Sequence, residues 1–168
     1  NARNIETAKL QLIIKEKLSG NDAFLYGGFI SRMVGLGRQA GIGCLVADTT
    51  QTWLEICNHH DLELENENAE LGRALELCGQ LLRWSNADSR LDFDDLLYLA
   101  VKDGLSLPKF DYVFVDEAQD TNAIQRALLR KILKADSRII AVGDPAQAIY
   151  GFRGADSDSL NLIAEEFN

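Results

Sequence analysis

Two short stretches of the chain place carboxylates directly after apolar runs. The first is YVFVDEAQD at residues 112–120, in which Asp116 and Glu117 follow the apolar residues. The second is RIIAVGD at residues 138–144, which ends in Asp144. Short apolar runs of this kind are typical of buried strands. Because open α/β sheets bind ligands outside the carboxyl ends of their strands, the two acidic ends are expected to form part of a nucleotide-hydrolysing site.

The adjacent carboxylates suggest two separate roles. In nucleotide hydrolysis an Asp at a strand end holds Mg²⁺, and the ion bridges phosphate oxygens and offsets their charge. A neighbouring carboxylate can orient and deprotonate the attacking water. Asp116 and Glu117 fit these roles in that order. Adjacent side chains of a strand point to opposite faces, so we expect the pair where the strand is already turning into its loop.

The segment after the second strand combines aromatic and basic residues. Tyr150, Phe152 and Arg153 lie in a loop flanked by glycines, which begins near Asp144. Aromatic side chains beside an Arg can stack on nucleic-acid bases without reading their sequence. One segment could therefore touch both the nucleotide and a nucleic acid, as mechanochemical coupling requires.

Together these stretches resemble a known family. VDEAQD at 115–120 and VGDPAQAIYGFRGA at 142–155 closely resemble motifs II and III of the UvrD/Rep-type superfamily 1 DNA helicases, and LDFDDLL at 91–97 resembles the segment that precedes motif II. The resemblance covers residues 91–168. Residues 1–90 would match the helical subdomain that is inserted into the first motor domain. The resemblance implies a fragment of an ATP-dependent DNA helicase that couples Mg-ATP hydrolysis to translocation on single-stranded DNA, 3′ to 5′, and to duplex unwinding.

The resemblance also implies roles by position. Asp116 would bind Mg²⁺, Glu117 would be the catalytic base, and Gln147 would sense the γ-phosphate and couple it to DNA, so that all three contact the nucleotide. The implied DNA-binding residues are Tyr150, Phe152 and Arg153. The family often has Trp in place of Phe152, although a Phe ring can still stack, which is worth about 1–3 kcal/mol per base. The implied partners are ATP, single-stranded DNA and proteins of repair or replication.

The phosphate-binding loop of such a site is missing from the sequence. No G-x-x-x-x-G-K-[ST] occurs, and the nearest glycine-rich stretch, GLGRQAGIG at 35–43, lacks the Lys-Ser/Thr pair and a preceding strand. The second motor domain, which would supply an arginine finger, is also absent. The chain is therefore expected to be a segment of a longer protein, with negligible ATPase activity and weak nucleotide binding by itself.

Residue periodicity predicts the elements that position these motifs. The first half is expected to form helices near 5–18, 29–40, 50–59 and 69–84. Asp92 is a predicted N-cap, and Asp94 and Asp95 in the same first turn are read as capping residues rather than metal ligands. The second half is expected to continue with a strand at 110–115, a helix at 122–134, a strand at 138–142 and a last helix at 157–167.

The predicted fold class is α/β. A strand, a helix and a second strand at this spacing imply a parallel pair with a right-handed crossover. We therefore expect residues 91–168 to form part of a RecA-like P-loop NTPase motor domain, preceded by a mainly α-helical inserted subdomain at 1–90. Parallel sheets are buried on both faces, so further strands are expected either in sequence outside the chain or in its first half.

Composition limits the remaining classes. The chain has 168 residues and a net charge of −9, which argues against a simple basic nucleic-acid-binding domain. No apolar run approaches the length of a membrane span. Cys44, Cys57 and Cys78 form no C-x-x-C pair, which favours reduced thiols in an intracellular protein. We expect a cytoplasmic, monomeric segment of bacterial or phage-like origin.

Three alternatives remain open at this point. A helicase–nuclease subunit of the same superfamily would carry both motifs and a downstream nuclease domain. A metal-dependent nuclease would use Asp116, Glu117 and Asp144 directly, which leaves the motif from Gln147 to Arg153 unexplained. A non-catalytic interaction module would depend on a partner to complete or replace the site.

Overall fold

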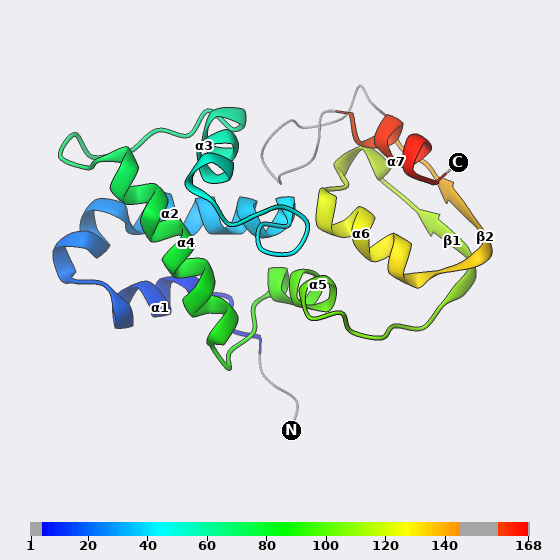
Figure 1. The fold of residues 1–168 in the computed structure, drawn as a ribbon, viewed down its shortest axis with the longest axis horizontal. Coiled ribbons are helices and arrows are strands. Elements are labelled where there is room, and N and C mark those ends of the chain that lie inside the picture. Colours follow the sequence, from blue (N-terminus) through cyan, green and yellow to red (C-terminus); the bar gives the residue numbers. More distant parts are fainter. Residues whose placement is uncertain (1–4, 145–157, 168) are drawn as a thin grey trace.

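The chain forms a helical part followed by a smaller part with a sheet (Figure 1). The computed structural model describes residues 5–144 and 158–167. The helices of the first part are α1 (Lys9–Lys17), α2 (Gly20–Ala40), α3 (Thr50–His59) and α4 (Leu71–Ala87). After them come α5 (Phe93–Lys102), β1 (Phe110–Val115), the short 3-10 helix η1 (Ala118–Asp120), α6 (Ala123–Ile132), β2 (Leu133–Ala141) and α7 (Ser159–Phe167).

The longest helix, α2, contributes much of the apolar core. It packs against α4, and its residues Ile30, Met33 and Val34 are fully buried. Trp53 of α3 is also buried in this core. Helix α2 begins at Gly20 rather than at the predicted residue 29. The side chain of Ser19 caps it by accepting a hydrogen bond from the Asp22 N–H at 3.1 Å, and this cap outweighs the weak helix propensity of the glycines that follow.

The two strands form the predicted parallel pair, with α6 as the connection between them. Strand β1 has the predicted bounds, whereas β2 begins at Leu133 instead of residue 138 and α6 ends at Ile132 instead of residue 134. The added part of β2, residues 133–137, reads LKADS and contains no apolar run that would predict a strand. Of this part only Leu133 pairs with β1, opposite Phe110, and the register shifts before the next pair, Tyr112–Arg138. The Lys134 ammonium group also binds the Asp111 carboxylate of β1 at 2.8 Å.

One face of this sheet carries exposed apolar side chains. Tyr112 and Phe114 alternate along β1, and Ile140, the partner of Phe114 across the ladder, lies beside them. Phe114 is 73% exposed and Tyr112 is 61% exposed. Residues 5–90 add no strand to the sheet; their only strand-like pairings are the isolated bridges Ile5–Leu91 and Ile42–Val46. The described part of the chain therefore leaves this face uncovered.

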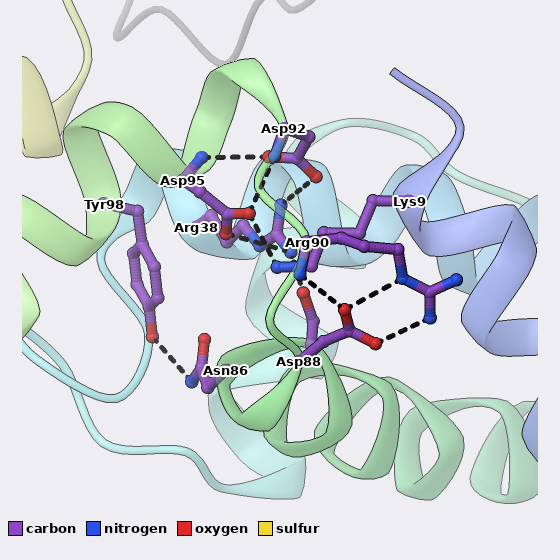
Figure 2. A network of polar contacts seen from close by, with 9 residues as sticks. Lys9, Arg38, Asn86, Asp88, Arg90, Asp92, Asp95 and Tyr98 are labelled. Atoms are coloured by element: carbon purple, nitrogen blue, oxygen red, sulfur yellow. Dashed lines mark hydrogen bonds and ion pairs between the residues drawn. The ribbon is translucent and has the colours of Figure 1, made fainter. Parts of the chain in front are cut away.

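A buried network of charges attaches α5 to the helical part (Figure 2). Lys9 of α1 and Arg38 of α2 have no exposed side-chain surface. The Lys9 ammonium contacts the Asp95 carboxylate at 2.6 Å, and the Arg38 guanidinium contacts Asp92 at 2.8 Å. Arg38 also donates a hydrogen bond to the hydroxyl of Ser85 in α4. Three helices of the first part thus meet at the first turn of α5.

The same two aspartates cap α5. The Asp95 N–H donates to the Asp92 carboxylate, and the Asp92 N–H donates to the Asp95 carboxylate, both at 2.9 Å. This reciprocal capping box confirms Asp92 as the predicted N-cap. Each carboxylate therefore serves the helix end and a buried cation at once.

Arg90 adds a second link beside this network. Its guanidinium contacts Asp88 at 2.6 Å and Glu16 of α1 at 2.8 Å. The hydrogen bonds from Arg90 lower the pKa of Asp88 to about 2. These contacts hold the segment that leads into α5 against α1. The pairs Lys9–Asp95 and Arg38–Asp92 cross residue 90, where the sequence suggested a domain boundary, so helix α5 is attached to the helical part while it leads into the sheet.

Replacing the buried Lys9 should lower the unfolding free energy far more than replacing an exposed lysine. Lys9→Met removes one partner of a buried ion pair and leaves Asp95 without exposure to water, which should cost about 3–5 kcal/mol of unfolding free energy. The control Lys17→Met changes an exposed lysine of the same helix and should stay within about 0.5 kcal/mol. Urea denaturation of the purified chain measures both, and similar values for the two variants would contradict the assignment.

Candidate functional site

The paired carboxylates lie directly after β1, in a tight turn. Strand β1 ends at Val115, so Asp116 and Glu117 stand outside it. Glu117 has a left-handed backbone, with φ 50° and ψ 42°, and its N–H donates to the Asp116 carboxylate at 3.0 Å. Both residues are exposed. The sequence predicted that the chain turns at this pair. In a strand the two adjacent side chains would point to opposite faces, and the turn removes this restriction.

The ends of the two strands lie against each other. The Val142 N–H donates to the Val115 carbonyl at 2.8 Å, and the Ala118 N–H donates to the Val142 carbonyl at 2.9 Å. Gly143 follows with no space for a side chain, because an added Cβ would lie 3.0 Å from the Ala118 nitrogen and would collide with the side-chain oxygen of Gln119. The second acidic stretch is therefore placed beside the first, as parallel strands require.

Gln119 joins these two strand ends through its side chain. It is buried in η1, where its amide nitrogen donates to the Glu117 carboxylate at 2.6 Å. Its amide oxygen accepts a hydrogen bond from the Asp144 N–H at 3.1 Å. Sequence reasoning missed this residue. The available signal was an amide, which has both donor and acceptor groups, within a motif of three acids.

The residues predicted to sense the γ-phosphate and to bind DNA are not among those that the structure describes. Gln147, Tyr150, Phe152 and Arg153 lie outside the described residues. The described residues on either side of them both contact the turn after β1. Before them, Asp144 bonds Gln119; after them, the Ser159 hydroxyl of α7 donates to the Thr121 carbonyl at 2.7 Å. The segment 116–121 after β1 thus contacts both flanks of the motif.

A cleft of about 1030 Å³ opens beside the carboxylates. Asp116 and Glu117 form one side of it. Helices α5 and α6 form the other, with the apolar residues Phe93, Leu97, Leu128 and Leu129. Asp94 of α5 also lines the cleft, and burial raises the pKa of its carboxyl group. The cleft is large enough for a ligand of nucleotide size, and it offers such a ligand both charged and apolar walls.

The donor set at the strand end suits magnesium. Mg²⁺ prefers hard oxygen ligands and is commonly held by one or two carboxylates together with water and substrate phosphates. The exposed carboxylate of Asp116 offers such an oxygen at the edge of the cleft. Among the described residues, no three His, Cys, Asp or Glu side chains are grouped to hold a metal ion. The arrangement therefore fits a single carboxylate that would hold Mg²⁺ together with water and a phosphate.

Comparison with known proteins gives consistent matches. The family model of the UvrD/REP helicase N-terminal domain matches residues 38–168. The chain is 40% identical over 88 residues to the ATP-dependent DNA helicase srs2 of Schizosaccharomyces pombe, covering 50% of the chain and 10% of that protein. It is 34% identical over 93 residues to the ATP-dependent DNA helicase PcrA of Staphylococcus epidermidis, covering 51% of the chain and 13% of PcrA.

A third relative matches more of the chain. The probable DNA helicase II homolog of Mycoplasma pneumoniae is 32% identical over 124 residues, which cover 68% of the chain and 17% of that protein. Each of these matches thus covers less than a fifth of the relative's length. Within the part of the chain that the structure describes, no helix is long and apolar enough to cross a membrane.

Proposed function

The chain belongs to the UvrD/REP helicase N-terminal domain family, and on that premise we propose that it is a working part of an ATP-dependent DNA helicase. Residues 91–168 would form part of a RecA-like P-loop motor domain, and residues 1–90 the helical subdomain inserted into it. The observation that carries the proposal is the position of Asp116 and Glu117. They stand in a turn at the carboxyl end of a parallel strand, beside the end of the next strand, where open α/β sheets bind their ligands.

The two carboxylates would divide the chemistry of ATP hydrolysis. Asp116 would hold Mg²⁺, and the ion would supply positive charge that offsets the charge of the phosphates. Glu117 would orient the attacking water and accept its proton. One oxygen of Glu117 is already held by the Gln119 amide, which leaves the other oxygen to face the water. ATP would occupy the cleft between this turn and helices α5 and α6.

The segment that begins at Asp144 would connect this site to DNA. Gln147 would sense the γ-phosphate, while Tyr150 and Phe152 would stack on the bases of single-stranded DNA and Arg153 would support the coupling. The hydrogen bond from the Asp144 N–H to Gln119 supports such a connection, because the Gln119 amide also holds the Glu117 carboxylate, so that a shift at Asp144 would reach it. The coupling would drive translocation on single-stranded DNA and duplex unwinding.

The open sheet face supports a larger motor domain. Parallel sheets are buried on both faces, yet Tyr112, Phe114 and Ile140 are exposed here. The missing cover and the P-loop would come from other parts of the helicase, in keeping with the small share of each relative that the chain spans.

Neutralising the proposed base tests the catalytic assignment. In the full-length helicase, Glu117→Gln should lower the kcat for ATP by about 10²–10⁴-fold, because a positioned general base contributes about that factor. Binding of ATP and DNA should remain. The control Glu67→Gln changes an exposed glutamate in the loop between α3 and α4 and should leave turnover unchanged. Unaltered turnover in Glu117→Gln would remove this residue from the mechanism.

Shortening Gln147 tests the connection to DNA. In the full-length helicase, Gln147→Ala should reduce DNA-stimulated ATPase activity and unwinding, because the contact between phosphate and DNA-binding segment would be lost. Steady-state ATPase assays with and without single-stranded DNA, together with a strand-separation assay, measure both effects. If stimulation and unwinding stayed at the wild-type level, the coupling role would be wrong.

The chain by itself should hydrolyse ATP at a negligible rate. It holds the carboxylates but not the lysine and backbone amides of a P-loop that cradle the phosphates. A phosphate-release assay on purified residues 1–168, with Mg²⁺ and single-stranded DNA, measures this rate. Robust turnover that Glu117→Gln abolishes would show that the chain carries a complete site.

A further inference from the structure

Gln119 lies between the two strand ends and contacts both of them. Its side chain is 4% exposed, and it stands two residues after the proposed catalytic base. On one side it bonds the carboxylate of Glu117, and on the other the backbone of Asp144.

The direction of both hydrogen bonds follows from the partners. An ionised carboxylate can only accept a hydrogen bond, and a backbone N–H can only donate one. The amide nitrogen of Gln119 must therefore face Glu117 at 2.6 Å, and its oxygen must face the Asp144 N–H at 3.1 Å. Gln has both groups on one rigid amide plane. A Glu side chain in this place could still accept the hydrogen bond from the Asp144 N–H but could not donate to Glu117. A Met side chain would lose both hydrogen bonds.

The contact with the second strand end is close as well as polar. The backbone at Gly143 approaches so near that a Cβ there would collide with the Gln119 oxygen. The neighbouring bond from the Ala118 N–H to the Val142 carbonyl continues the same contact at 2.9 Å. The backbone at 143–144 therefore cannot move relative to this turn without displacing the Gln119 amide, and with it the carboxylate that the amide holds.

We propose that Gln119 is a positioning residue that transmits the position of the Gly143–Asp144 backbone to the carboxylate of Glu117. This inference rests on the proposed function, in which Glu117 is the base and Asp144 begins the DNA-coupled segment. DNA binding would set the backbone at 143–144, and the Gln119 amide would then hold Glu117 in the direction of the attacking water. The DNA-induced increase in turnover would depend on this amide.

The test uses Gln119→Met and Gln119→Glu in the full-length helicase. The first removes both bonds at similar volume, and the second keeps an acceptor for the Asp144 N–H while placing a like charge against Glu117. Both should lower the ratio of DNA-stimulated to basal kcat by about 10-fold or more, since a misplaced catalytic group costs up to about 10²-fold. The KM for ATP should stay within about 3-fold, because no phosphate-binding group changes.

A matched control and a second site keep the result interpretable. Gln51→Met makes the same exchange at an exposed position of α3 and should leave the ratio unchanged. Gly143→Ala disturbs the same contact from the second strand end, because its Cβ would collide with the Gln119 oxygen. It should lower the ratio of DNA-stimulated to basal kcat in the same way. Because both changes break one link, the double variant Gln119→Met with Gly143→Ala should lose no more than the larger single change.

The outcomes separate this inference from the proposed function. A folded Gln119→Met or Gln119→Glu protein that loses basal and DNA-stimulated kcat equally, or loses neither, overturns the link and leaves the helicase assignment intact. Multiplicative losses in the double variant also overturn it. A wild-type protein whose ATP turnover does not respond to DNA overturns the proposed function and the link together. If Gln119→Met fails to fold, Gln119→Glu and Gly143→Ala decide the question.

Discussion

Two cations without exposed surface, Lys9 and Arg38, determine where helix α5 lies. Removing a charged side chain from water is costly, and only close pairing and hydrogen bonding offset that cost. Both cations find their partners in the first turn of α5, at Asp95 and Asp92. Helix α5 in turn provides an apolar wall of the cleft beside the carboxylates. The position of that wall therefore depends on buried charges that take no part in the chemistry proposed for the site.

The motifs and the strand pairing were accessible from the sequence because both are local. The apolar runs predicted β1 with its correct bounds, and the spacing predicted its parallel partner. Asp92 was recognisable as an N-cap from its place before an apolar helix. The turn at Asp116 and Glu117 followed from the opposite directions of adjacent strand side chains. Each of these inferences needed only neighbouring residues and one geometric rule.

The buried network and the Gln119 bridge were not accessible in this way. Lys9 and Asp95 are separated by 86 positions, and Arg38 and Asp92 by 54, so no spacing rule brings them together. In a helical pattern, Lys9 and Arg38 look like ordinary surface charges. Gln119 and Asp144 meet only because the strands are adjacent. The start of β2 escaped prediction because residues 133–137 contain no apolar run and, among them, only Leu133 pairs with β1.

The bare face of the sheet has a practical consequence for handling the protein. Phe110, Tyr112 and Phe114 form an alternating aromatic row on a strand whose outer edge pairs with no other strand of the described chain. Such rows beside unpaired edges are templates for intermolecular strand addition. A preparation of these residues alone is therefore prone to self-association. Polar replacements on this one face, rather than changes in the helical part, are the rational route to a soluble sample.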